Sequence, residues 1–220
     1  MSSNQASSSS QSKFKRQRYV FSVLAILLVV GSVWLWEEIL EERTIPKRFG
    51  VVEQGLIYRS GQLHKALVEK TLRKYKIAKI VDLTGGVPGD QNQQAEIRAT
   101  QNLGIDRVAL YLEGDGTGDI RHYAEAIAFI HDAVQQSKPV LVHCAAGTQR
   151  TGGVIAAYRL LVQKRPPSEV QHEMSEYGWR ATGNPALPQY LNDNMDRLAE
   201  ILVAKGVLDQ VPQPLPQLGP

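Results

Sequence analysis

Residues 140–153 read Val140-Leu-Val-His-Cys-Ala-Ala-Gly-Thr-Gln-Arg-Thr-Gly-Gly153, and this segment constrains the rest of the 220-residue chain most strongly. Its apolar start, Val140–Val142, predicts a short buried strand, and the small and hydroxyl residues that follow predict a tight loop. The apolar spacing from Thr151 to Val162 predicts a helix directly afterwards. Five residues separate Cys144 from Arg150, so a thiol and a guanidinium lie at the two ends of one loop.

The loop between those two residues suits a phosphate group. A loop that leads into a helix N-terminus points backbone N–H groups inward, and these groups and the helix dipole bind a dianion. The small side chains at its start let the backbone approach closely, and Gly147 can take a positive φ. Arg150 can hold two phosphate oxygens with its planar fork. We therefore predict a phosphate-binding loop formed by Ala145, Ala146, Gly147, Thr148 and Gln149.

Cys144 is the single cysteine of the chain, so no internal disulfide can form. A single cysteine is in most proteins a small buried apolar residue. In this loop, however, the positive field should lower the thiol pKa from ~8.5 to roughly 3.5–7.5 and make the thiolate a nucleophile. Thr151 is predicted to donate a hydrogen bond to the sulfur, and His143 to hold the loop through its ring nitrogens.

The segment His143-Cys144-Ala-Ala-Gly147-Thr-Gln-Arg150-Thr151-Gly152 resembles the His-Cys-x5-Arg-Ser/Thr-Gly loop of the protein tyrosine phosphatase superfamily. The size and layout are similar to its compact dual-specificity branch, as found in bacterial members. Upstream, Phe49-Gly-Val-Val-Glu-Gln-Gly-Leu-Ile-Tyr-Arg-Ser-Gly-Gln62 resembles the N-terminal segment of that group, and Ile80-Val-Asp-Leu83 its next strand. The resemblance covers residues 45–200. Rhodanese-like sulfurtransferases, the alternative, typically have a shorter loop without the Arg-Thr-Gly ending.

This resemblance implies a phosphomonoester hydrolase that acts on protein Tyr, or also on Ser and Thr, through a cysteinyl-phosphate intermediate. It implies Cys144 as nucleophile and Arg150 as phosphate clamp, with no metal and no organic cofactor. Two other functions stay open. A phosphoinositide or inositol phosphate phosphatase usually carries Lys or Arg inside the loop, whereas residues 145–149 are uncharged. A non-catalytic, membrane-tethered phosphate-binding module would keep the loop without a working acid or nucleophile.

The resemblance also implies an Asp on a mobile loop that serves as general acid and then as general base. Asp115 lies 29 residues before Cys144 between two glycines, which suits a loop that moves. We predict Asp115 as the catalytic acid, with Asp119 as the alternative, although Asp119 is better explained as a helix N-cap. Asp115 as an ordinary turn residue is the competing interpretation. Glu113 is interpreted as a solvated charge.

Strands that alternate with helices predict an α/β fold with a central, mostly parallel sheet flanked by helices. A hairpin is expected from Phe49–Glu53 and Leu56–Ser60. Further strands are expected at Ile80–Leu83 and Arg107–Leu112, and helices at Lys65–Tyr75, Gln93–Leu103, Ile120–Gln136, Pro167–Tyr177 and Leu187–Lys205. The resemblance implies that Arg59, Ser60 and Gln62 lie near the site, and a hydrogen-bonded strand end is the alternative interpretation of these residues. Trp179 is expected in the core, and Asp82 at a strand end.

The N-terminal residues form a separate region. Residues 1–18 are predicted to be a disordered basic tail, and residues 19–36 lack charge and predict a single transmembrane helix roughly 27 Å long. A cleaved signal peptide is the alternative, but no small-x-small cleavage site follows. Basic residues before the span favour a domain on the extracytoplasmic side, with a cytoplasmic domain as the alternative. The catalytic domain is expected at 49–206, after a spacer at 37–48 and before a loose Pro-rich tail at 207–220.

The charge distribution excludes a nucleic-acid-binding domain. Four of the 25 Lys and Arg residues precede residue 37, where no Asp or Glu occurs, so the remainder has 21 basic and 22 acidic residues. No basic face is therefore left on the domain. His64, His122, His131 and His172 show no metal-ligand spacing. The expected partners are a phosphorylated substrate and a membrane.

Overall fold

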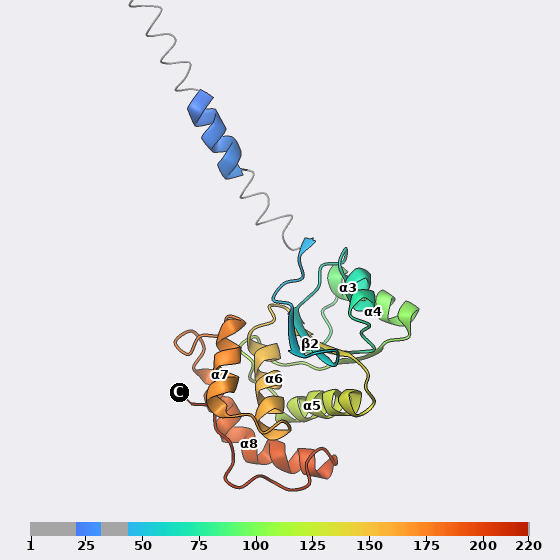
Figure 1. The fold of residues 1–220 in the computed structure, drawn as a ribbon, viewed down its shortest axis with the longest axis vertical. Helices are drawn as coiled ribbons and strands as arrows, with labels where there is room; N and C mark the ends of the chain where they lie inside the picture. The colour runs from blue at the N-terminus through green and yellow to red at the C-terminus, as the bar shows by residue number, and fades with distance from the viewer. Residues whose placement is uncertain (1–20, 32–43, 220) are drawn as a thin grey trace, which may run out of the picture. The chain divides into compact units, whose positions relative to one another are not determined.

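The computed structural model describes residues 21–31 and 44–219 and divides the chain into two units, residues 1–44 and Ile45–Pro220. The second unit is an α/β domain built on one five-stranded sheet (Figure 1). Its strands are β1 (Gly50–Glu53), β2 (Ile57–Gly61), β3 (Lys79–Asp82), β4 (Asp106–Ala109) and β5 (Val140–Cys144). Their order across the sheet is β1-β2-β5-β3-β4, which places β5 in the middle.

The sheet is mostly parallel, as predicted. β5 pairs in parallel with β2 on one side and with β3 on the other, and β3 pairs in parallel with β4. The one antiparallel pair is the predicted β1–β2 hairpin, which turns at Gly55 with φ +78°. Ligands of open parallel sheets bind at the carboxyl ends of the strands, and β5 ends there at Cys144.

Helices cover both faces of the sheet (Figure 1). α3 (Val68–Lys74) and α4 (Gln91–Leu103) pack on one face, against Tyr58, Ile80 and Leu141. α5 (Ile120–Gln135), α6 (Gln149–Leu161), α7 (Pro167–Glu176) and α8 (Ala186–Ala204) form the larger core on the other face. The strand residues alternate between these cores with the period of two expected for extended backbone.

Helix boundaries follow the local signals where those signals are strong. Asp119 caps α5 and accepts a bond from Arg121 N, and Gly104 ends α4 with φ +65°, both as predicted. The predicted helix Lys65–Tyr75 is shorter, because residues 65–67 form a turn in which Leu67 N donates to His64 O at 2.7 Å. The helix predicted from Thr151 instead begins at Gln149, within the phosphate-binding loop.

Two predicted boundaries of the domain are wrong. The spacer was placed at 37–48, but Lys47 O accepts from Gly61 N at 2.7 Å and Arg48 contacts the phosphate-binding loop, so the domain includes these residues. The C-terminal tail is not loose, because Leu218 is only 3% exposed and packs into the main core. Asn192 holds both the N–H and the carbonyl of Leu218, each at 2.9 Å.

The predicted transmembrane span, residues 19–36, lies partly outside the described residues. Its described part, residues 21–31, is a helix whose apolar side chains are exposed, with Leu28 at 73%. Among residues 21–31 and 44–219, no helix has the length and apolarity needed to cross a bilayer. The tail at 1–18 and residues 37–43 of the predicted spacer also lie outside the described residues.

Candidate active site

The phosphate loop, residues 144–150, joins the end of β5 to the first turn of α6. Gly147 has φ +79°, and a Cβ on it would lie 2.5 Å from Gly61 N, so only glycine fits this position. Its N–H donates to Cys144 Sγ at 3.2 Å. The predicted strand, loop and helix therefore place the thiol at the floor of a tightly packed backbone turn.

Three consecutive carbonyls of the phosphate loop are held from outside the loop. Ala145 O accepts from Gln62 N at 3.1 Å, and Ala146 O accepts from Arg48 Nη1 at 2.9 Å. Gly147 O accepts from Arg59 Nη2 at 2.9 Å. In a planar trans peptide the N–H points opposite to the carbonyl, so these bonds turn the following N–H groups toward the inside of the loop.

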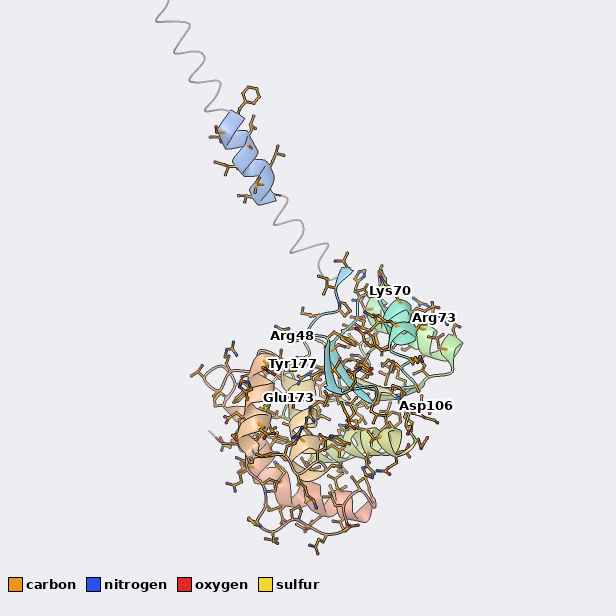
Figure 2. All side chains as sticks on the ribbon, viewed as in Figure 1. Arg48, Lys70, Arg73, Asp106, Glu173 and Tyr177 are labelled. Carbon is orange, nitrogen blue, oxygen red and sulfur yellow. The ribbon has the colours of Figure 1, made fainter. Side chains whose placement is uncertain are left out.

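Arg59 and Arg48 come from outside the signature segment. Arg59 is fully buried on β2, and its guanidinium lies 3.8 Å from the centre of the Tyr177 ring. Burial lowers its pKa to about 10, and the charges of nearby groups oppose that shift. Arg48 is exposed, and Figure 2 labels both Arg48 and Tyr177. Sequence analysis placed Arg59 near the site but missed Arg48, because nothing in its neighbours marks a residue that folds back onto the loop.

The environment of Cys144 favours its thiolate. Burial alone would raise the thiol pKa, but the Thr151 hydroxyl and N–H, the Gly147 N–H and the Arg150 charge together lower it. Thr151 is fully buried in the first turns of α6. Among the described residues the buried Thr151 hydroxyl has no hydrogen-bond partner, so its bond to the sulfur stays a prediction. A thiolate at neutral pH is what nucleophilic attack requires.

Arg150 lies at the far end of the phosphate loop, and its guanidinium makes only a weak hydrogen bond to the described residues. Its Nη1 lies 3.5 Å from Leu83 O, which is a long contact for a hydrogen bond. Its buried Nε has no hydrogen-bond partner among the residues that the structure describes. A guanidinium in this state can bind phosphate oxygens without first breaking a strong internal bond.

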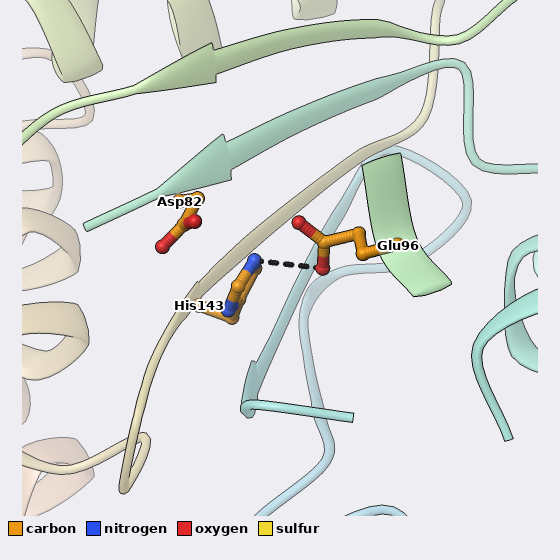
Figure 3. A group of neighbouring side chains, drawn as sticks. All are labelled: Asp82, Glu96 and His143. Atoms are coloured by element: carbon orange, nitrogen blue, oxygen red, sulfur yellow. Dashed lines mark ion pairs between the residues drawn. The ribbon is translucent and has the colours of Figure 1, made fainter. Parts of the chain in front are cut away.

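His143 does not hold the phosphate loop through its ring, contrary to the prediction. Its Nε2 lies 3.0 Å from Glu96 Oε2 on α4, and the two groups form a buried ion pair (Figure 3). Although burial disfavours the charged ring, Glu96 raises the pKa of His143 to about 9. Within the described residues, His143 Nδ1 has no hydrogen-bond partner. The imidazolium therefore supplies a fixed positive charge beside Cys144.

Asp82 does more than end a strand. It pairs with Arg107 Nη2, and Arg107 Nε also donates to Glu96 Oε1 at 2.8 Å. The acceptor atoms of Asp82, Glu96 and His143 lie within 4.8 Å of one another, a spacing that metal ligands can have (Figure 3). Arg107 already pairs with both carboxylates, so the charges of this cluster are balanced within the protein.

The loop predicted to carry the acid, residues 113–119, is named the acid loop here. Asp115 is exposed, and its Oδ1 accepts from Thr117 N at 2.9 Å and from Thr117 Oγ1 at 2.8 Å. These bonds lower the pKa of Asp115. Buried Tyr123, whose hydroxyl donates to Gly116 O at 2.5 Å, has its pKa raised by burial and by the charges of Asp115 and Cys144. A Cβ on Gly116 would lie 3.2 Å from Gln149 O, so the acid loop lies beside the start of α6, where the phosphate loop ends.

Asp119, the alternative acid, is already engaged. Its carboxylate caps α5 and also receives the Arg121 guanidinium, which lowers its pKa to about 2. The cationic Arg121 opposes protonation of Asp119, whereas Asp115 is held only by the neutral groups of Thr117, so Asp115 remains the better candidate for the proton donor. Trp179 is buried in the core, as predicted, and Ser60 is buried beneath the phosphate loop.

Solved structures with the same architecture are known. The crystal structure of TpbA from P. aeruginosa aligns with 73% of this chain and 91% of its own, with a TM-score of 0.57 and 19% identity. The catalytic core of the PP-IP phosphatase SIW14 from S. cerevisiae aligns with 78% of this chain and 97% of its own, with a TM-score of 0.57 and 22% identity. These likenesses show that this chain and the two solved proteins share one fold.

The family follows from the sequence comparison. The model of the dual specificity phosphatase catalytic domain matches residues 61–175, so this chain belongs to that family. Dual specificity protein phosphatase OPG106 of vaccinia virus is 34% identical over 98 residues, which cover 41% of this chain and 56% of the viral protein. Dual specificity protein phosphatase Mpk3 of Drosophila melanogaster is 31% identical over 104 residues, covering 47% and 23% respectively. The chain thus spans little more than half of the viral relative's length.

Proposed function

We propose that this protein hydrolyses phosphomonoesters on protein tyrosine, and on serine or threonine, through a cysteinyl-phosphate intermediate. The observation that carries the proposal is the buried Cys144 thiol with its lowered pKa, at the floor of a loop whose N–H groups are turned inward. The match to the dual specificity phosphatase family supports the same reaction class. Its assignment to the bacterial branch stays a prediction.

In the first step the Cys144 thiolate attacks phosphorus while the inward N–H groups and Arg150 bind the equatorial oxygens. The P–O bond to the substrate breaks as the P–S bond forms, and Asp115 gives its proton to the leaving oxygen. In the second step Asp115 takes a proton from water, which attacks phosphorus and releases inorganic phosphate. Cys144 departs as a thiolate that the Thr151 hydroxyl stabilises.

The uncharged phosphate loop favours substrates with a single phosphate at the reacting position. Residues 145–149 supply N–H groups but no cationic side chain, so Arg150 is the one cationic side chain of the loop. Extra phosphates on an inositol ring would find no partner inside this loop. A phosphorylated protein side chain, rather than an inositol ring with several phosphates, is therefore the substrate class that we propose.

The test uses the full chain under reducing conditions, with a phosphotyrosine peptide and 4-nitrophenyl phosphate as substrates. We expect Cys144→Ser to abolish turnover and to retain phosphate binding. Asp115→Asn should lower kcat by roughly 10²–10⁴-fold, the usual contribution of a general acid. Turnover that persists in Cys144→Ser would refute the mechanism. An inactive parent protein that still binds phosphate would instead identify a binding module.

We further propose that residues 19–36 anchor the protein in a membrane, with the domain on the extracytoplasmic side. Support comes from the uncharged sequence and from exposed apolar side chains on the described helix at 21–31, such as Leu28. An exposed helix of this composition needs an apolar environment. Extraction of cell membranes with alkaline carbonate should leave the full chain in the pellet, and release into the supernatant would refute the anchor.

A further inference from the structure

Asn184 connects two loops that must cooperate in catalysis. It lies in the turn before α8 and is 7% exposed. Its Nδ2 donates to Asp115 O at 2.6 Å and to Gln149 Oε1 at 2.8 Å, while its Oδ1 accepts from Leu187 N at 3.3 Å. Both hydrogens of one amide are therefore shared between the acid loop and the start of α6.

The bond to the acid loop reaches the backbone of Asp115 rather than its carboxylate. Asn184 thus restrains the backbone of Asp115 without engaging its carboxylate, which accepts hydrogen bonds from Thr117. The bond to α6 reaches Gln149, the residue before Arg150. Asn184 consequently sets the distance between the residue that carries the acid and the residue beside the phosphate clamp.

The same two loops also touch directly. A Cβ on Gly116 would lie 3.2 Å from Gln149 O and 2.9 Å from the Leu187 side chain, and Gly116 has φ +94°. The acid loop can approach α6 this closely only because glycine occupies this position. Tyr123 and Tyr190 hold the neighbouring carbonyls, Gly116 O and Gly118 O. Among these contacts, Asn184 is the one that joins both loops through a single side chain.

We propose that Asn184 is a positioning residue that holds the acid loop in register with the phosphate loop, so that Asp115 can protonate the leaving oxygen. This inference rests on the proposed function of Asp115. Loss of the amide would leave the thiolate and the phosphate loop intact but would misplace the acid. Misplacement of a catalytic group by about 1 Å can cost on the order of 10²-fold in rate.

The experiment compares Asn184→Asp and Asn184→Ala in the full chain. The aspartate keeps the shape and the acceptor for Leu187 N but has no N–H donor, and the alanine adds no charge. The matched control is Asn192→Ala, which removes a half-buried amide on α8 that bonds to the C-terminal segment instead of the loops. The substrates are 4-nitrophenyl phosphate, whose leaving group needs little protonation, and phenyl phosphate, whose leaving group needs much.

We expect both Asn184 variants to lose at least roughly tenfold more kcat with phenyl phosphate than with 4-nitrophenyl phosphate, because only the acid step is impaired. The pH dependence of Cys144 alkylation by iodoacetamide should stay unchanged, and Asn192→Ala should lower the two rates equally. Equal losses on both esters, or no loss, would overturn the proposal. If Asp115→Asn itself loses equally on both esters while Cys144 remains essential, the acid assignment fails and this proposal falls with it.

Discussion

At the scale of single residues, the positive charge of His143 in the signature segment depends on Glu96, which lies outside that segment on α4. His143 is adjacent to the nucleophile and fully buried, so an isolated imidazole there would be neutral. Glu96 keeps it protonated from α4, and Arg107 balances the remaining carboxylate charge. The pair therefore contributes both to the field at Cys144 and to the stability of the domain.

The pH dependence of stability follows from that pair, and Glu96→Gln tests it. The folded-state pKa of His143, about 9, is above its ordinary 6.5, so the stabilisation is complete below pH 6.5 and is lost as pH rises through 9. Glu96→Gln should lower the free energy of unfolding by about 3 kcal/mol at pH 6.5, which is at the low end of the range for a broken buried ion pair. The loss should be smaller at pH 9.5. Urea unfolding at both pH values measures this.

The matched control for that variant is Glu69→Gln, which removes one member of the exposed Glu69–Arg73 pair. Its effect should stay within about 0.5 kcal/mol at both pH values. A destabilisation of Glu96→Gln that does not change between pH 6.5 and pH 9.5 would contradict the charged state of His143. Such a result would mean that the whole effect comes from the lost ion pair between Glu96 and Arg107, which stays charged at both pH values.

Sequence reasoning could group the residues that lie close together along the chain. Cys144, Arg150 and Thr151 lie within one short segment, so their spacing alone brings them near one another. Asp82, Glu96 and Arg107 come from three different elements and meet only after the sheet and α4 have packed. No periodicity in the sequence encodes such a meeting, and Asp82 was accordingly interpreted as an ordinary strand end.

At the scale of elements, the phosphate loop is shaped from behind by the segment that precedes β1. Arg48 adopts φ +45°, which costs a residue with a Cβ roughly 1–2 kcal/mol. Its guanidinium donates to Ala146 O, and the next N–H, that of Gly147, then faces Cys144 Sγ. The strained backbone is thus offset by a bond that orients the anion-binding surface.

Arg48→Gly separates the strain from the hydrogen bond. Glycine relieves the positive φ but removes the donor, so the free energy of unfolding should stay within about 1 kcal/mol of the parent. The loop should nevertheless bind vanadate roughly 3- to 10-fold more weakly, as expected for one lost hydrogen bond. Calorimetric titration measures the affinity. Arg73→Ala, an exposed arginine on α3, is the control, and unchanged affinity in Arg48→Gly would refute the role of Arg48.

At the scale of the whole molecule, the C-terminal segment belongs to the folded domain. Its prolines exclude a helix, which is why the sequence predicted a loose tail. The prediction failed because the segment is held by tertiary contacts instead of local ones. Leu218 fills the main core, and Asn192 satisfies the two backbone groups that its burial would otherwise leave unpaired.

Leu218→Ala measures how much this segment contributes to the stability of the domain. Removal of a buried leucine side chain typically costs about 2–5 kcal/mol, because the apolar contact is lost and a cavity remains. We expect that loss in urea unfolding, whereas Gln217→Ala, at an exposed neighbour, should change stability by no more than about 0.5 kcal/mol. If the two variants are equally stable, the tail is loose, as its sequence suggested. If only Leu218→Ala is destabilised, the folded domain extends at least to Leu218, and truncation before residue 218 would weaken the scaffold that carries α8 and Asn184.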